Sequence, residues 1–187
     1  MKITETFIQG LLIIEPLIFE DERGYFFESY NKINYLKNGF DAEFIQDNES
    51  KSVKGVVRGL HYQLAPFAQS KLVRAVQGRV FDVAVDLRKG SPTYGKWFGL
   101  ELNDINKKQL FIPQGFAHGF SVLSETTVFS YKCGNIYNRE FERSLNCNDP
   151  HLKIDWQIAP SQQIISEKDK NAPFFENAEM NFIFQPK

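Results

Sequence analysis

Hydrophobic and polar residues alternate along much of this chain, in short runs separated by glycine, proline and asparagine. The clearest run lies between Arg79 and Arg88. Its apolar positions are Phe81, Val83, Val85 and Leu87, and its alternate positions are Asp82, Ala84, Asp86 and Arg88. A period of two residues is that of a β-strand, whose successive side chains point to opposite faces. We therefore expect one face of this strand to meet the hydrophobic core and the other to meet polar groups.

The same pattern predicts short strands through most of the chain, with prolines falling between them. The expected strands are Leu11–Phe19, Tyr25–Ser29, Ala42–Asn48, Val53–Tyr62, Ser70–Gln77, Val80–Leu87, Phe98–Leu102, Gln109–Ile112, His118–Leu123 and Thr127–Cys133. Many short strands with turn residues between them are typical of an all-β sandwich or barrel. No repeat, low-complexity tract or shift in composition marks a linker, so we expect residues 1–187 to form a single domain.

Helix signals are few. Asn31–Asn38 is expected to form a short helix that ends at Gly39, and Ser161–Asp169 a second one with Ser161 as its cap. Both helices are expected at the periphery of the fold.

The composition argues against two classes of function, the binding of long nucleic acids and insertion into a membrane. The 187 residues include 22 Lys and Arg against 23 Asp and Glu, and a net charge of −1 offers no basic surface for long nucleic acids. Cys133 and Cys147 form no paired motif and follow no signal-like segment, so we expect free thiols in a cytoplasmic protein. No stretch approaches the roughly 20 apolar residues that span a bilayer, and membrane insertion is not expected.

The most informative stretch for chemistry is Gly55–Gly78, which places Arg58, His61 and Lys71 within reach of one hairpin. Arg58 and His61 have an odd separation, so a regular strand would send them to opposite faces, but Gly59 can host a β-bulge that turns both inward. An anion binder, a base and a cation suit the removal of a proton from carbon beside a carbonyl on a phosphorylated substrate.

A catalytic metal is not expected. The segment FIPQGFAHGF contains P-x-G-x-x-H, which resembles half of the double motif of cupin jelly rolls. The histidines are His61, His118 and His151, and none has the H-x-H spacing of metal-binding cupins. Two interpretations of His118 stay open: a core histidine on a barrel wall, or a ligand contact.

Other candidates also have two interpretations. Tyr131 lies in the expected strand Thr127–Cys133 and is either a packing residue or a functional hydroxyl. Asp169 lies in a charged stretch and is either solvated or a partner that orients the imidazole of His61. Arg23 and Glu28 flank aromatic residues in an edge hairpin or a binding wall.

Together the motifs resemble the dTDP-4-dehydrorhamnose 3,5-epimerase family, the sugar-nucleotide epimerases of rhamnose biosynthesis. The matching segments run through nearly the whole chain and are FEDERGYFFE, QDNES, GVVRGLHYQ, QSKLVRAVQG, VFDVAVDLRKGSPTYGKW, FIPQGFAHGF, YKCGNIY, NDP and SEKD. The resemblance implies an all-β double-stranded β-helix, or jelly roll, of the cupin type. It also implies short peripheral helices, no metal or cofactor, and a homodimer that exchanges an N-terminal hairpin.

The resemblance assigns roles by motif position. His61 matches the base, Asp169 its partner, Tyr131 the acid on the opposite sugar face, and Lys71 the group that stabilises the enolate oxygen. The residues that match substrate-binding positions are Arg23, Glu28, Gln46, Asn48, Arg58, His118, Glu142 and Lys168. Tyr137 matches the tyrosine that stacks on the base, while Phe19 and Phe26 would come from the partner's hairpin.

The expected function is inversion at C3 and C5 of dTDP-4-dehydro-6-deoxy-D-glucose, giving dTDP-4-dehydro-L-rhamnose. Alternatives within the same chemistry are a C3-only or C5-only epimerase and an enzyme for a GDP-linked or heptose substrate. A non-catalytic jelly-roll sugar-binding protein is a further alternative, and a metal-dependent cupin enzyme is a third.

Overall fold

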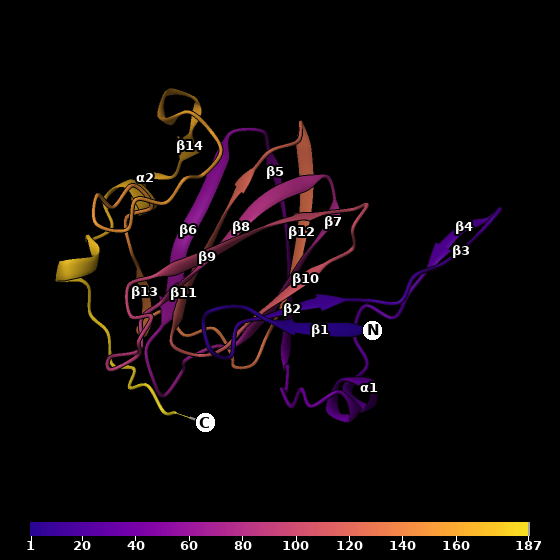
Figure 1. Cartoon of the computed structure of the whole chain (residues 1–187). Coiled ribbons are helices and arrows are strands. Elements are labelled where there is room, and N and C mark those ends of the chain that lie inside the picture. Colours follow the sequence, from indigo (N-terminus) through magenta and orange to yellow (C-terminus); the bar gives the residue numbers. More distant parts are fainter. Residues whose placement is uncertain (187) are drawn as a thin grey trace.

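The computed structural model describes residues 1–186, which form mostly β-strands arranged in two facing antiparallel sheets (Figure 1). The first sheet has the order β1 (Lys2–Glu5), β2 (Leu12–Glu15), β10 (Gln109–Ile112), β7 (Lys71–Gln77), β12 (Thr126–Cys133) and β5 (Gln46–Val53). The second has the order β13 (Glu142–Ser144), β6 (Val56–Gln63), β11 (Phe116–Val122), β8 (Arg79–Asp86) and β9 (Trp97–Asn103), and β14 (Ile164–Ile165) pairs in parallel with β6. The prediction of a mostly-β, two-sheet protein is confirmed.

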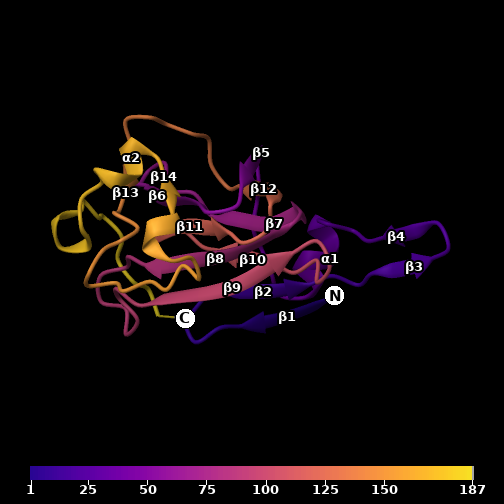
Figure 2. The ribbon, with the colours of Figure 1, turned by 90° about the horizontal axis from the view of Figure 1, so that it is seen from above.

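The remaining elements lie at the periphery. The hairpin of β3 (Phe19–Asp21) and β4 (Gly24–Phe26) projects from the body in two perpendicular views (Figures 1 and 2). The predicted first helix is confirmed as α1 (Lys32–Lys37), which Asn31 caps. The C-terminal part contributes η1 (Pro160–Gln162), α2 (Glu167–Lys170) and η2 (Phe175–Asn177).

Three clusters of buried apolar residues hold these layers together. The first fills the space between the sheets and includes Val73, Ala84, Phe120 and Phe129. The second lies between the outer face of the second sheet and the C-terminal segment, where Trp156 packs. In the third, residues of α1 and the segment after it cover the outer face of the first sheet. Apolar surface is thus buried on both faces of each sheet.

The predicted alternation in β8 is confirmed, and the two acidic residues on its second face lie inside the protein. Asp82 and Asp86 are both 0% exposed. Asp82 binds His118, while Asp86 accepts hydrogen bonds from Arg88 and Ser91. Because an unpaired buried carboxylate is costly, these partners explain why a strand buried on both faces tolerates two acidic residues.

The predicted helix Ser161–Asp169 is wrong. A single 3-10 turn begins at Pro160, the chain then extends, and Ile164 pairs with Val56 of β6. The cap of the short helix that follows is Ser166, whose hydroxyl accepts from the Asp169 amide. Two adjacent β-branched isoleucines favour strand over helix, which accounts for the break.

Strand boundaries near the N-terminal part also differ from the prediction. The expected strand Leu11–Phe19 ends at Glu15, because Pro16 has no amide hydrogen to continue the ladder. The expected strand Ala42–Asn48 begins later and continues as β5 to Val53. The sequence pattern missed β1 and β13, which are short strands at the edges of the sheets.

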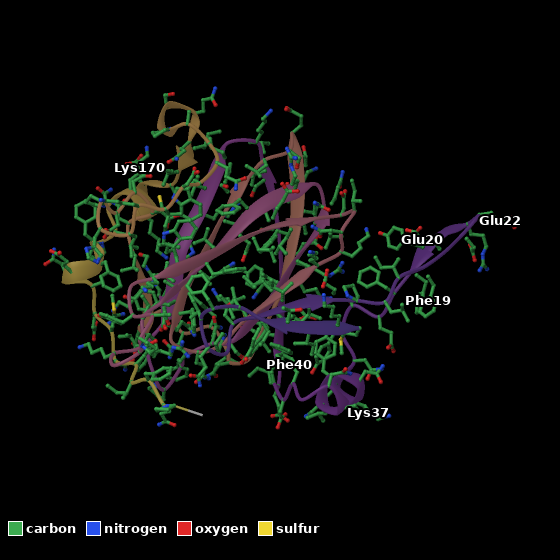
Figure 3. All side chains as sticks on the ribbon, viewed as in Figure 1. Phe19, Glu20, Glu22, Lys37, Phe40 and Lys170 are labelled. Carbon is green, nitrogen blue, oxygen red and sulfur yellow. The ribbon has the colours of Figure 1, made fainter. Side chains whose placement is uncertain are left out.

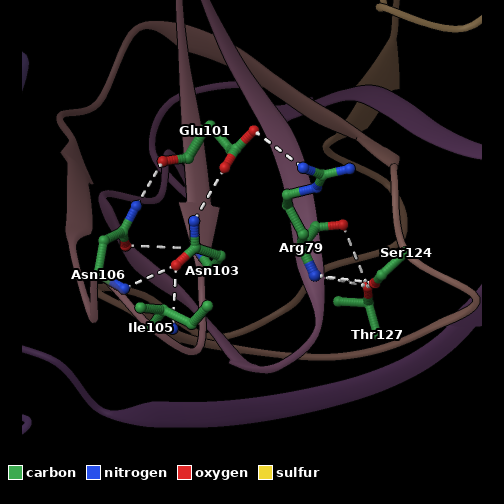
Figure 4. A network of polar contacts seen from close by, with 7 residues as sticks. All are labelled: Arg79, Glu101, Asn103, Ile105, Asn106, Ser124 and Thr127. Carbon is green, nitrogen blue, oxygen red and sulfur yellow. Dashed lines mark hydrogen bonds and ion pairs between the residues drawn. The ribbon is translucent and has the colours of Figure 1, made fainter.

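A polar network organises the end of the sheets opposite Lys71 (Figure 4). Asn103 and Asn106 close the turn after β9, where the Asn103 side chain accepts from the Ile105 and Asn106 amides. Glu101 accepts from Asn103 and lies 3.9 Å from the guanidinium of Arg79. These bonds stabilise the turn after β9 and connect β9 to the start of β8.

Candidate active site

The first sheet brings its candidate residues onto one face. Lys71 in β7, Cys133 in β12 and Gln46 in β5 lie side by side in register. Two residues along the strands, Tyr131 lies beside Asn48 in the same way. Because residues two apart on a strand share a face, these side chains all point to the space between the sheets.

The second sheet presents His61 and His118 to the same space. His118 in β11 pairs directly with His61 in β6, and the register then shifts so that Phe120 pairs with Arg58. The predicted bulge at Gly59 is thereby confirmed. Gly59 has a φ of 125°, and a Cβ there would lie 2.5 Å from the Gly119 Cα, so only glycine fits this crossing.

A pocket of about 300 Å³ opens at this end of the sheets. Its lining residues are Gln46, Asn48, His61, Tyr62, Gln63, Gln69, Lys71, Tyr131, Cys133, Tyr137 and Glu142. Many of the predicted site residues therefore meet in one cavity, although they come from different strands and from the loop after β12.

His61 is paired with Asp169. The His61 Nε2 lies 2.7 Å from the Asp169 Oδ1, and the imidazole is 33% exposed while the carboxylate is 6% exposed. The solvated interpretation of Asp169 is wrong. Burial alone would raise the pKa of Asp169, but the hydrogen bond and charge of His61, together with the Ser166 cap, lower it below its usual range. An anionic Asp169 can stabilise an imidazolium on His61.

Lys71 is a largely desolvated cation. Burial lowers its pKa, and the neighbouring Cys133, Asp82 and Glu142 oppose that shift. Its ammonium lies 5.9 Å from the centre of the Tyr131 ring, and among residues 1–186 no carboxylate is within ion-pair distance of it. The cation is therefore available to an anion that enters the pocket.

Tyr131 stands on the wall opposite His61, since the two residues belong to different sheets. Burial is the main cause that raises the pKa of its hydroxyl, Cys133 adds to the rise, and Arg58 opposes it. The Arg58 Nε donates to the Ser52 hydroxyl at 3.0 Å, which directs this guanidinium toward the first sheet. A protonated Tyr131 can donate a proton from the wall that faces the base.

His118 packs in the interior, as the core interpretation predicts, and the pocket lining does not include it. The residue as a whole is 7% exposed, its ring stacks on Phe129, and its Nε2 lies 2.8 Å from the Asp82 Oδ2. Burial lowers the pKa of His118 and raises that of Asp82, so both shifts favour uncharged forms. Sequence reasoning missed Asp82 as the partner of His118, because the alternation in β8 placed it only on the face expected to meet polar groups.

Three predicted residues meet at the mouth of the pocket. The Tyr137 hydroxyl donates to the Glu142 carboxylate at 3.0 Å, and the Lys168 ammonium lies 2.7 Å from the same oxygen. Burial would raise the pKa of Glu142, but the hydrogen bonds from Lys168 and Tyr137 lower it. The tyrosine, the carboxylate and the cation form a polar rim around the entrance.

The hairpin residues lie apart from the pocket of their own chain. Arg23 is exposed and paired with Asp21, and the Glu28 carboxylate accepts from the side chains of Asn31 and Asn34. Figure 3 labels Phe19 on the projecting hairpin, and Phe26 pairs with it across the two strands. None of these four candidates lines the pocket that contains His61 and Lys71 of the same chain.

Residues 1–186 contain no group of three or more His, Cys, Asp or Glu side chains arranged to hold a metal ion. No helix in this part of the chain is long and apolar enough to cross a membrane.

Comparison with known proteins identifies the family. The family model for dTDP-4-dehydrorhamnose 3,5-epimerase matches residues 5–177. The enzyme of that name from Shigella flexneri is 52% identical over 180 residues, which cover 96% of this chain and 98% of that protein.

Solved structures of similar sequence point to the same family. The crystal structure of dTDP-4-dehydrorhamnose 3,5-epimerase from Elizabethkingia anophelis is 55% identical with a TM-score of 0.89, covering 94% of this chain and 97% of that one. A Legionella pneumophila dTDP-6-deoxy-D-glucose-3,5-epimerase in complex with dTDP-4-keto-L-rhamnose is 47% identical with a TM-score of 0.94, covering 99% of each chain. The chain therefore belongs to the dTDP-4-dehydrorhamnose 3,5-epimerase family and has its cupin-like fold.

Proposed function

We propose that this protein inverts C3 and C5 of dTDP-4-dehydro-6-deoxy-D-glucose through an enolate, with His61 as base and Tyr131 as acid. The product is dTDP-4-dehydro-L-rhamnose, and the protein is an isomerase of dTDP-L-rhamnose biosynthesis. One observation carries the proposal: His61 and Tyr131 face one pocket from opposite sheets, and Lys71, which has no ion-pair partner among residues 1–186, lies beside the tyrosine.

The proton is removed from a carbon next to the 4-keto group. His61 takes this proton, and the electron pair moves onto the keto oxygen, so the sugar itself accepts the charge. Asp169, 2.7 Å from the imidazole, stabilises the imidazolium that forms. Lys71 stabilises the enolate oxygen, a contribution of about 3 kcal/mol or more in a site that excludes water.

Inversion follows when the new proton arrives from the other face. Tyr131 donates it from the opposite wall, and the electron pair returns from the oxygen to carbon. The raised pKa of Tyr131 keeps the hydroxyl protonated at neutral pH until the enolate has formed. A single base alone would return the proton to the face from which it came.

The nucleotide occupies the mouth of the pocket. Tyr137 stacks on the base, while Lys168 and Arg58 provide positive charge for the diphosphate. Gln46 and Asn48 line the pocket between this mouth and Lys71 and contact the sugar. Glu142 holds Tyr137 and Lys168 together until the substrate enters.

The active assembly is a homodimer with exchanged hairpins. Support comes from the hairpin itself, because it projects into solvent with Phe19 57% and Phe26 67% exposed. Large apolar side chains on a projecting element are typical of an interaction surface. In the dimer the hairpin of one copy brings Arg23 and Glu28 to the pocket of the other.

A product assay by NMR tests the function. The purified protein is incubated with dTDP-4-dehydro-6-deoxy-D-glucose and, separately, with a GDP-linked 4-keto sugar. Conversion of the dTDP sugar to the 3,5-inverted product supports the proposal. Inversion at C3 alone or turnover of the GDP sugar alone would replace it with the corresponding alternative, and binding without any inversion would indicate a non-catalytic sugar-binding protein.

A further inference from the structure

The loop of residues 134–141, between β12 and β13, spans the mouth of the pocket and carries Tyr137. Gln63, at the end of β6, holds this loop from the side of the second sheet. Its amide nitrogen donates to the carbonyl oxygens of Phe67 at 2.7 Å and Ile136 at 3.1 Å. Its oxygen accepts from the amide of Asn138 at 2.7 Å. Gln63 is 4% exposed, so these bonds form in a desolvated environment.

Gln46 holds the same loop from the first sheet. Its side-chain oxygen accepts from the Tyr137 amide at 3.0 Å, and its nitrogen donates to the Asn48 side chain at 3.1 Å. The backbone before, at and after Tyr137 is therefore bound by two glutamines from opposite sheets. This clamp fixes the direction in which the tyrosine ring leaves the loop.

We propose that Gln63 is a positioning residue that aims Tyr137 at the nucleotide base. The inference rests on the stacking role of Tyr137 in the proposed function. Gln63 lies two residues after His61 on the same strand, so β6 positions both the catalytic base His61 and the loop that receives the nucleotide. The clamp thus fixes the distance between the reacting sugar and the nucleotide subsite.

The variant Gln63→Glu tests the clamp with almost no change in shape. A carboxylate can still accept from the Asn138 amide, but it has no hydrogen to donate and would face the carbonyl oxygens of Phe67 and Ile136. Gln63→Met removes all three bonds without adding charge and serves as the second variant. Gln114→Glu is the matched control, because Gln114 likewise donates to a backbone carbonyl, that of Ala68, and lies outside the pocket lining.

The experiment measures dTDP affinity by calorimetry together with kcat and KM for the sugar nucleotide. Stacking of a base on an aromatic ring contributes roughly tenfold to a hundredfold in affinity. Tyr137→Ala, Gln63→Glu and Gln63→Met should each weaken dTDP binding by a factor in this range and raise KM more than they lower kcat. Adding Gln63→Glu to Tyr137→Ala should cause no further loss, and Gln114→Glu should bind dTDP as the wild type does.

Three results would overturn the inference, and they are distinguishable. If Tyr137→Ala weakens dTDP binding but both Gln63 variants bind normally, or if the losses multiply in the double variant, Gln63 does not act through Tyr137. If Tyr137→Ala itself binds dTDP normally, the stacking role in the proposed function fails and the inference fails with it. Thermal unfolding of each variant separates these results from a general loss of folding, which would lower kcat and affinity together.

Discussion

Two histidines face each other across β6 and β11, and each has an aspartate, yet their environments differ. The His61 side chain is 33% exposed and lines the pocket, whereas His118 is 8% exposed and stacks on Phe129. A base must contact its substrate and gain a proton, which suits the first pair. The second pair is enclosed, and burial lowers the pKa of His118, so it remains neutral. The geometry therefore favours His61 over His118 as the proposed base.

Replacing the acid should separate proton removal from inversion. In Tyr131→Phe, His61 can still remove the proton and return one to the same face. Incubation in D2O should then place deuterium in the recovered substrate with unchanged configuration, while epimerised product is lost. The NMR spectrum of the sugar measures both. Wild-type rates of inversion in this variant would show that another group is the acid.

Deprotonation of Lys71 should determine the pH at which activity is lost in alkaline solution. Burial lowers its pKa below that of an ordinary lysine. The Lys71 ammonium is charged below its folded pKa and loses its proton as the pH rises through that pKa. The decline of kcat with rising pH should therefore begin at a pH lower than 10.5, the ordinary pKa of lysine. Lys71→Ala should lower kcat on the order of 100-fold to 1000-fold.

The matched variant for this profile is Lys71→Arg, whose guanidinium stays charged. It should be slower than the wild type, with an alkaline limb displaced to higher pH, where Tyr131 ionises. An identical limb in Lys71→Arg and the wild type would mean that another group titrates.

Sequence reasoning found residues whose chemistry is unusual for a strand. It missed residues whose roles depend on hydrogen bonds to distant parts of the chain. His61, Lys71 and Tyr131 stand out as a base, a cation and a hydroxyl within strand-forming runs. Asp82 and Gln63 become informative only through bonds to residues far along the chain, at positions 118 and 136 to 138. No local pattern contains those contacts.

At the level of elements, local periodicity identifies central strands better than edges and helices. β8 and β10 match the predicted strands closely because both have an apolar face that the core must bury. β13 and β14 are too short for a period to be visible, and each pairs with β6 across a long separation in sequence. The second predicted helix failed because Ile164 and Ile165 pair with β6, and this pairing adds to the strand preference of the two isoleucines.

The docking of α1 on the first sheet should make stability depend on pH in alkaline solution. Tyr35 in α1 is 3% exposed and donates to the Ser29 carbonyl, and burial raises its pKa to about 12. The folded state disfavours the phenolate, so stability is intact below the ordinary pKa of about 10. The free energy of unfolding declines as the pH rises from about 10 toward 12, and the ionisation of Tyr35 accounts for about 3 kcal/mol of this decline.

Urea unfolding between pH 9 and 12 measures this dependence. In Tyr35→Phe the free energy of unfolding should decline less steeply over the same range, with the remaining decline due to other buried tyrosines such as Tyr62, whose pKa burial also raises. Equal slopes for the variant and the wild type would refute the assignment to Tyr35.

For the whole molecule, the sequence pattern predicted an all-β sandwich or barrel, because short alternating strands have few other ways to bury their apolar faces. It contained no information on assembly, since an exchanged hairpin and a free one have the same local pattern. The exposed aromatics of β3 and β4 become informative only when the structure places them beyond the body.

Mixed dimers test whether the hairpin acts on its own subunit or on the partner. His61→Ala and Arg23→Ala are co-expressed with different tags, and the mixed dimer is isolated. With exchanged hairpins one of its two sites contains both His61 and Arg23, so activity should recover to about half of the wild-type value. If each hairpin serves its own subunit, the mixed dimer should be no more active than the Arg23→Ala dimer.

The central claim is that His61 and Tyr131 transfer protons on opposite faces of one sugar. The most direct measurement is the reaction of the wild-type protein with dTDP-4-dehydro-6-deoxy-D-glucose in D2O, followed by NMR of the product. We predict deuterium at both C3 and C5 with inverted configuration, and no deuterium with His61→Ala. Product that retains its original hydrogens, or equal labelling by wild type and His61→Ala, would contradict the claim.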